Sequence, residues 1–254
     1  MRRVREIQDK DRPRAGRCQA PGGTWLYCLL AMGLCLCGCT FRQEAAFSGP
    51  SWQPPPEAVA RPPELPQVGK WMLDAQNEPA HWLGELRGAK HLREPINVVI
   101  VDATARSAQE ARQRLLRNLA AVGYTARKGH SAGYRGYIEG VVYPQLPEGK
   151  EEAFSNEPFE MSNNHGRIFG PHPCRGGWLF IGAFSREKMD LLDKVKHRYV
   201  SFNQARDDLS QRLDTTTDYR IKDFLDLDNA LIGDRTVTSG DHDGVAVLMT
   251  TAGS

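Results

Sequence analysis

The stretch Ile96–Val101 most constrains how this chain can fold. Its residues are nearly all apolar and β-branched, and Pro95 precedes it. A short run of this composition predicts a central strand of a sheet, because a strand at the surface alternates apolar and polar residues. The chain has 254 residues, of which 40% are hydrophobic, so it is long enough to build one packed domain around that strand.

Two main helices and several further strands are expected around this strand. Ser107 and Glu110 form a capping box for a helix that runs to about Val122, and Gly123 stands where helices commonly end. Asn203 is expected to cap the second main helix. The further expected elements are that helix over 204–213, a short helix over 185–195, and strands over 124–127, 167–169, 177–184, 197–202, 216–221 and 245–249. Together they predict an α+β fold, with a mixed β-sheet packed against two main helices in an α/β sandwich.

Two other stretches are less regular. Trp71–Leu92 has loosely helical apolar spacing that Pro79 interrupts, so residues 70–94 are expected to form a packing arm with one or two short helices. Gly129–Gly149 is rich in glycine and tyrosine, which fits either a mobile binding loop or a long connection whose tyrosines pack on the core. It lacks the lysine and the strand-to-helix context of a phosphate-binding loop. Residues 95–254 are predicted to be the main domain.

The N-terminal 38 residues have the organisation of an export signal. A basic segment, Met1–Arg17, precedes 14 apolar residues, Thr24–Cys37. An apolar run of this length fits a signal peptide, which needs about 7–15 residues, and is short for a membrane-spanning helix of about 20. The sequence Leu36-Cys37-Gly38-Cys39 resembles a bacterial lipoprotein signal, in which Leu, a small residue and Gly or Ala precede the modified Cys. Ala or Ser is commoner in that signal where Cys37 stands.

The lipoprotein resemblance implies a lipid on the Cys39 thiol, cleavage before Cys39, and two or three acyl chains that hold the protein to a membrane. Thr40 in place of Asp favours, by the same resemblance, the outer membrane facing the periplasm over the inner membrane. A short uncleaved anchor is the alternative. In both cases the positive charge ahead of the apolar run places the domain outside the cytoplasmic membrane. Residues 39–69 carry seven prolines and are predicted to be a tether, with a proline ligand for a partner groove as the alternative.

Charge and cysteine content exclude several classes of function. Residues 1–38 hold seven Lys and Arg against three Asp and Glu, so the rest of the chain is −2 while the whole chain is +2. A mildly acidic domain has no electrostatic reason to bind nucleic acid. Five of the six cysteines lie in the first 39 residues and Cys174 is alone, so the domain has no disulfide framework and no paired-cysteine metal site. No cofactor and no metal site are predicted.

The order of several short motifs resembles one known family. The Ile96–Val101 strand and a helix that ends in Ala121-Val122-Gly123-Tyr124 come first. The motifs that follow are Asn164-His165-Gly166-Arg167, Gly177-Trp178-Leu179-Phe180-Ile181-Gly182-Ala183-Phe184-Ser185 and His197-Arg198-Tyr199. Over about residues 95–213 this order resembles the C-terminal domain family named after the secretion-system protein LssY. The resemblance implies a bacterial envelope domain of unassigned activity, and it carries over no catalytic residue.

Candidate site residues are the polar side chains nearest the predicted core strands. His165 with Arg167 could bind an anion or form a structural hairpin, and His197 could hydrogen-bond the start of the next helix. Cys174 stands two residues after His172, but a proline on each side holds that histidine in a tight loop. An incidental loop cysteine is therefore favoured over a thiol nucleophile.

The sequence thus predicts a lipid-anchored envelope lipoprotein with a non-catalytic binding or structural role. Its expected partners are membrane lipid, through acylation of Cys39, and another envelope protein. The alternative is a periplasmic hydrolase that uses the neighbourhood of His165, His172 and His197. A pocket that joins two of these histidines to an acidic group would favour the hydrolase, whereas the sequence Asp-His-Asp-Gly at 241–244 is typical of a turn.

Overall fold

The structure is a computed structural model that describes residues 52–190 and 196–251. These residues belong to one compact unit. The predicted signal peptide, Cys39 and the first part of the predicted tether lie outside the described residues. In chain order, the elements are η1 (Pro56–Ala58), β1 (Val59–Ala60), β2 (Val68–Gly69), β3 (His81–Arg87), β4 (Lys90–Arg93), β5 (Val98–Asp102), α1 (Ala108–Ala121), β6 (Thr125–Lys128), β7 (Arg135–Ile138), β8 (Val141–Leu146), β9 (Glu152–Ser155), β10 (Asn163–Cys174), β11 (Gly177–Asp190), β12 (Lys196–Ser201), α2 (Phe202–Thr216), β13 (Tyr219–Asp226), β14 (Val237–Thr238) and β15 (Val245–Thr251).

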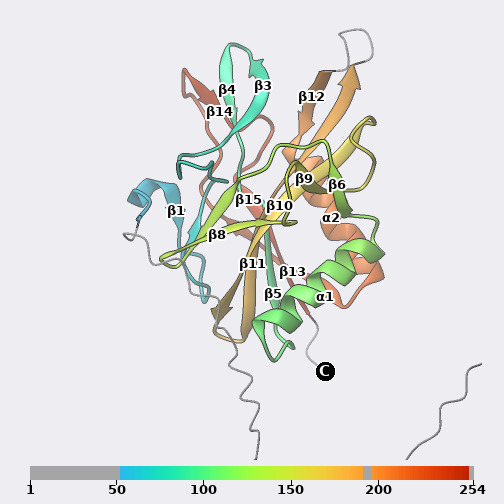
Figure 1. The fold of residues 1–254 in the computed structure, drawn as a ribbon. Coiled ribbons are helices and arrows are strands. Elements are labelled where there is room, and N and C mark those ends of the chain that lie inside the picture. The colour runs from blue at the N-terminus through green and yellow to red at the C-terminus, as the bar shows by residue number, and fades with distance from the viewer. Residues whose placement is uncertain (1–51, 191–195, 252–254) are drawn as a thin grey trace, which may run out of the picture. The chain divides into compact units, whose positions relative to one another are not determined.

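One large sheet organises the domain (Figure 1). Its main path runs β1-β2-β7-β8-β10-β11-β5-β15-β13, with β12 paired to β11 and β6 and β9 paired beside β10. A second sheet joins β14, β4 and β3. The predicted central strand is confirmed, because β5 lies between β11 and β15 and all five of its residues are buried. It runs antiparallel to β11 and parallel to β15.

The two faces of the central strands are covered by different elements. Successive side chains of a strand point to opposite faces. Val98 and Ile100 of β5 therefore meet the helices, whereas Val99 and Val101 meet the curled part of the sheet and the N-terminal arm. The core on the helix side includes Leu115, Leu119, Phe180, Phe184, Leu209, Leu213, Val247 and Met249, and the opposite core includes Val68, Ile138, Leu179, Ile181 and Leu248.

The predicted mixed α+β class is confirmed, but the fold is mostly β, with 46% strand. Both helices cover one face of the central strands, so the expected helix-packed sandwich describes only that face. The predicted cap of α1 is present, since Ser107 Oγ accepts a hydrogen bond from Glu110 N at 3.1 Å. The cap of α2 is Ser201 rather than Asn203, because Ser201 Oγ accepts from Gln204 N at 2.9 Å. No helix in the described part of the chain is long and apolar enough to cross a membrane.

Three stretches differ from the sequence-based predictions. The prediction of a helix over 185–195 is wrong for residues 185–190, which continue strand β11 with Ser185 and Glu187 buried. Residues 191–195 lie outside the described part of the chain. The arm at 70–94 holds strands β3 and β4 instead of short helices. Gly88 and Ala89 both have positive φ, which is the geometry of a tight two-residue hairpin turn, and these two residues join β3 to β4.

The predicted tether also ends earlier than residue 69. Val68 of β2 is fully buried and pairs with Ile138 of β7, so the last part of the proline-rich stretch belongs to the folded sheet. The glycine- and tyrosine-rich stretch forms the β7–β8 hairpin. Tyr134 belongs to the core opposite the helices and Tyr143 packs against that core, which confirms that tyrosines of this stretch pack on the core.

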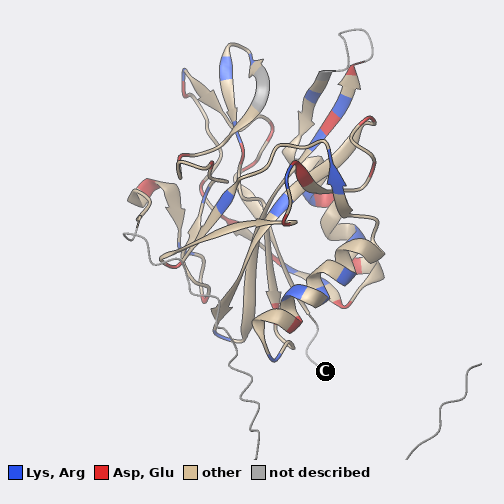
Figure 2. Ribbon diagram, viewed as in Figure 1, with Lys and Arg blue, Asp and Glu red and all other residues tan. Residues whose placement is uncertain are grey.

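Figure 2 shows charges along α1 and on the ribbon formed by β11 and β12. Glu187 lies in this charged segment of β11, yet only 3% of it is exposed. Carboxylates are seldom buried unless other groups bind them. The burial of Glu187 therefore indicates that neighbouring side chains hold its carboxylate.

Gly166 tests the close approach of β10 to β11. A Cβ at this position would lie 2.4 Å from the carbonyl oxygen of Ala183 in the neighbouring strand. We expect Gly166→Ala to lower the free energy of unfolding by about 1–3 kcal/mol, because the backbone cannot move aside without strain. Urea denaturation measures this loss. Gly69→Ala is the control, since its Cβ would meet Tyr137 Cβ at 3.3 Å, and a Gly166 variant no less stable than the control would contradict the register.

His242 makes the stability of the fold depend on pH. Its Nε2 hydrogen-bonds Asn229 Oδ1 at 2.7 Å, and the Asn229 amide in turn donates to the Lys70 and Ile96 carbonyls. Burial lowers the pKa of His242 to about 4, although nearby Asp243 opposes the shift. An unfolded histidine titrates near 6.5, so between these values the unfolded state binds more protons and stability falls as the pH falls.

We therefore expect His242→Gln to reduce the pH dependence of unfolding. Between pH 7 and pH 5 the variant should lose about 2 kcal/mol less stability than the wild type. Urea denaturation at the two pH values measures the difference. An equal loss in both proteins would show that His242 is not held neutral in the fold.

Candidate functional site

One face of the β10–β11 pair changes from apolar to polar along its length. The register pairs Asn163 with Glu187, His165 with Ser185 and Arg167 with Ala183. Because side chains alternate along a strand, these residues share the face that lies away from the helices. All of them are at most 5% exposed, so the polar stripe is enclosed rather than solvated.

The carboxylate of Glu187 is the centre of this stripe. Its Oε1 accepts a hydrogen bond from Asn163 Nδ2 at 2.8 Å, and His197 Nδ1 lies 2.8 Å from the same oxygen. His165 Nδ1 lies 3.6 Å from it. The register of β11 with β12 shifts between Arg186 and Glu187, so that His197 stands opposite Met189 and reaches Glu187 diagonally.

His130 completes the cluster from the loop after β6. Its ring stacks on His165, with the centroids 4.6 Å apart and the planes at 27°. Its Nε2 is buried and has no hydrogen-bond partner among the described residues. One ligand atom each from His130, His165 and Glu187 lie within 4.8 Å of one another. We call His130, His165, Glu187 and His197 the His–Glu cluster; its first three members could hold a metal ion.

Phe159 covers the His–Glu cluster. Its ring stacks on His197 with the centroids 4.0 Å apart, and its edge meets His130 at 5.1 Å. Gly129 leaves the room that this ring needs, because a Cβ there would lie 2.6 Å from Phe159 Cγ. The loop that precedes β10 thus closes the site with an apolar side chain.

Burial shifts the pKa values of the enclosed groups. It lowers the pKa of His130 to about 3 and that of His165 well below the usual value, so both imidazoles are neutral near pH 7. Burial raises the pKa of Glu187, and the Asn163 hydrogen bond opposes this. Burial also raises the pKa of Glu94 to about 7, against the attraction of nearby Arg167.

Arg167 supports the site instead of facing a ligand. Its Nη2 donates to the Ser131 carbonyl at 2.7 Å, and its guanidinium lies 4.9 Å from the centroid of the Tyr134 ring. Both contacts are to the loop that carries His130. Arg167 therefore fixes that loop against β10.

The structure brings together only part of the predicted histidine set. His165 and His197 meet at Glu187, whereas His172 lies seven residues beyond His165 on β10 and hydrogen-bonds Tyr143 Oη at 2.9 Å. Burial raises the pKa of the Cys174 thiol, which disfavours a nucleophilic thiolate.

The Asp-His-Asp-Gly stretch is a structural turn, as predicted. The Asp241 carboxylate accepts from Ser201 Oγ and Tyr199 Oη, and from Phe202 N at 2.8 Å. These bonds hold the start of α2.

His130 and Glu187 are the site residues that sequence reasoning missed. His130 is 35 positions from His165 and stands in a glycine-rich stretch, so no metal-ligand spacing marks it. Glu187 fell in the predicted helix over 185–195. Had that segment been recognised as a strand, its alternation would have placed Glu187 inward.

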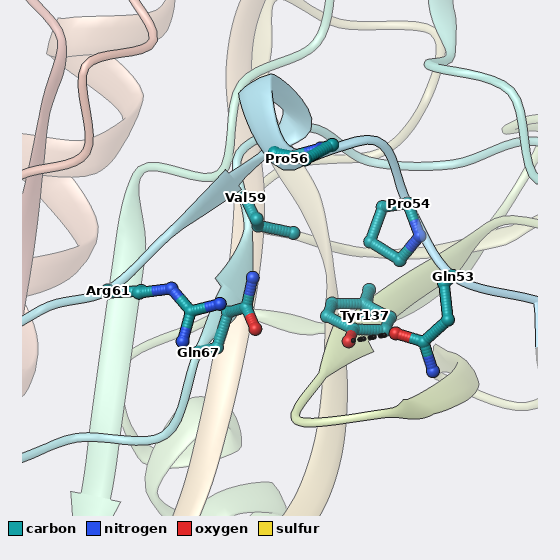
Figure 3. A pocket seen from close by; sticks show the side chains of 7 residues that line it. All are labelled: Gln53, Pro54, Pro56, Val59, Arg61, Gln67 and Tyr137. Carbon is teal, nitrogen blue, oxygen red and sulfur yellow. Dashed lines mark hydrogen bonds between the residues drawn. The ribbon is translucent and has the colours of Figure 1, made fainter.

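A separate pocket lies beside the N-terminal arm (Figure 3). Its volume is about 450 Å³, and Tyr137 Oη donates to Gln53 Oε1 at 3.0 Å within it. The residues that line it are Gln53, Pro54, Pro56, Val59, Arg61, Gln67 and Tyr137. The pocket shares no residue with the His–Glu cluster, and Arg61 is the one charged side chain in its lining.

Comparison with protein-family models, curated proteins and solved structures gives no match. The resemblances to a lipoprotein signal and to the LssY C-terminal domain therefore stay predictions.

Replacing Arg167 tests whether its positive charge stabilises the buried carboxylates of Glu94 and Glu187. We expect Arg167→Met to lower the free energy of unfolding by about 3 kcal/mol, because it leaves buried Glu94 and Glu187 without their cation. Adding Glu94→Gln should recover part of this loss, which a double-mutant cycle by urea denaturation measures. The control is Arg112→Met, at a partly exposed surface pair, where the loss should stay below about 1 kcal/mol. Equal losses at Arg167 and Arg112 would contradict the account.

Proposed function

We propose that this chain is a lipid-anchored protein of the bacterial envelope whose folded domain binds a ligand at the His–Glu cluster without transforming it. The observation that carries the proposal is the enclosure of three imidazoles around one carboxylate. Acylated Cys39 would hold the domain at the outer membrane, facing the periplasm, where another envelope protein could contact it.

The His–Glu cluster stabilises the fold less than apolar side chains at the same positions would. Removing charged and polar groups from water costs free energy that apolar residues of similar size would not cost. His130 Nε2 and His197 Nε2 are buried without a hydrogen-bond partner within the described part of the chain. Buried nitrogens without a partner are unfavourable, so their presence supports a bound ligand that would supply the missing interactions.

The sequence motif at Cys39 supports the anchor, and the chain length limits how far the domain can lie from the membrane. The Trp52 ring meets the Tyr137 ring edge-on with the centroids 6.1 Å apart, so Trp52 is already part of the folded domain. Twelve residues, 40–51, separate it from Cys39. An extended chain of that length spans at most about 40 Å. The domain would therefore work close to the membrane surface, on a shorter tether than the proline content suggests.

A hydrolase is the second candidate, and two observations favour it. His165 and His197 meet at one acidic group, Glu187, and a serine lies beside His165. Ser185 Oγ lies 3.4 Å from His165 Nε2, while His165 Nδ1 faces Asn163 Oδ1 at 3.1 Å and Glu187 beyond it. This order of hydroxyl, imidazole and acidic group is that of a serine hydrolase. Labelling by a fluorophosphonate that is lost in Ser185→Ala would establish the hydrolase and overturn the binding role. We expect no such labelling, because Ser185 is 1% exposed.

The anchor is tested by metabolic palmitate labelling with membrane fractionation. Wild type should take label and sediment with the outer membrane. Cys39→Ala should lose both properties, because its side chain has no thiol to acylate. Cys37→Ala is the matched control and should behave as wild type. If Cys39→Ala kept the label, or if wild type took none, the anchor would be wrong.

A further inference from the structure

We propose that the His–Glu cluster binds one divalent transition-metal ion of the Zn²⁺ class, with His130, His165 and Glu187 as its ligands. This names the ligand of the site proposed above and rests on that function. Two imidazole nitrogens and one carboxylate oxygen form a typical three-residue set for such an ion and leave a fourth position for water. Ca²⁺ and Mg²⁺ prefer sites made only of oxygen ligands, so the chemistry of the cluster disfavours them.

The distances suit this ion after a small adjustment. The three candidate ligand atoms lie within 4.8 Å of one another. Metal–ligand distances of about 2.0–2.2 Å in a tetrahedral site place neighbouring ligand atoms about 3.3 Å apart. The remaining difference of about 1.5 Å is within the reach of side-chain rotation. The two strand residues, His165 and Glu187, start from neighbouring positions of a continuous antiparallel pair.

An unpartnered nitrogen points to the ion. His130 Nε2 is buried and makes no hydrogen bond with any described residue, although its ring is stacked against His165. A buried ring nitrogen without a partner is unfavourable, and a metal ion would supply the missing interaction. His130 lies on a loop rather than a strand, so it is also the ligand best able to move toward an ion.

Other residues of the cluster position the carboxylate. Asn163 Nδ2 and His197 Nδ1 each lie 2.8 Å from Glu187 Oε1, which fixes the direction of the second carboxylate oxygen. Residues that hydrogen-bond to metal ligands commonly orient them in this way. His197 is therefore a positioning residue in this proposal, and Phe159 above it shields the site from bulk water.

The chain carries its own control for nonspecific binding. His81 and His91 form a second histidine pair on β3 and β4, with ring centroids 5.2 Å apart. His91 is exposed. Among the described residues, no Asp, Glu or Cys lies close enough to His81 and His91 to complete a set of three metal ligands. A metal ion that binds nonspecifically to any accessible histidine would therefore bind at this second pair.

The test is a titration of the purified full chain in detergent, with its six cysteines replaced by serine so that no thiol competes for the ion, and with bound metal removed by a chelator. Zn²⁺ is added in competition with a chromophoric chelator, and we expect one equivalent to bind with a dissociation constant below about 1 μM. His130→Gln and Glu187→Gln should each weaken binding at least about 100-fold, whereas His197→Gln should weaken it about 10-fold. His91→Gln should bind as wild type does. Circular dichroism reports whether each variant folds.

A cysteine at the loop position keeps the test decisive if the glutamine variants fail to fold. In a background in which all six native cysteines are serine, His130→Cys restores a single thiol ligand, and Co²⁺ bound to it should show a thiolate-to-cobalt charge-transfer band that the background alone lacks. Absence of that band, unchanged Zn²⁺ affinity in His130→Gln, or loss of binding in His91→Gln would each overturn the metal site. Palmitate labelling does not depend on the ion, so a protein that takes label but binds no Zn²⁺ would overturn this inference alone.

Discussion

The antiparallel pairing of β10 with β11 is the constraint on which the rest of the structure depends. Its register puts Ile168 toward the helices and Phe169 toward the opposite core, so both cores are assembled on one pair of strands. The same register sets Asn163 opposite Glu187 at the far end. A slip of one residue would exchange the two faces of a strand, burying apolar side chains in the wrong core and dispersing the cluster.

Enclosure of the polar end of this pair requires support from distant parts of the chain. Arg167 ties down the loop of His130, and Phe159 closes over His130 and His197. The cost of burying Glu187 is offset in part by the Asn163 amide and by His197. These contacts join three separate segments around one carboxylate. This convergence supports the binding site that we propose at the His–Glu cluster.

The sequence predicts the elements whose local signals agree with their packing. The β-branched run of β5 and the capping box at Ser107 are strong local signals, and both are confirmed. Predictions from local sequence are wrong where pairing between distant strands determines the structure. The segment after Ser185 is predicted to be helical, but it continues β11 because β12 pairs with it. The site is only partly predictable for the same reason. His165 and His197 stand beside recognisable strands, but His130 is brought to them by a loop whose path no sequence period encodes.

Diffraction at the zinc absorption edge, from crystals of the full chain grown with Zn²⁺, would test the central claim most directly. We expect a single anomalous peak inside the fold, within about 2.2 Å of ligand atoms from His130, His165 and Glu187. A fully occupied peak at His81 and the exposed His91, with none at the His–Glu cluster, would contradict it. In that case the buried imidazoles and carboxylate would be a polar element of the fold itself.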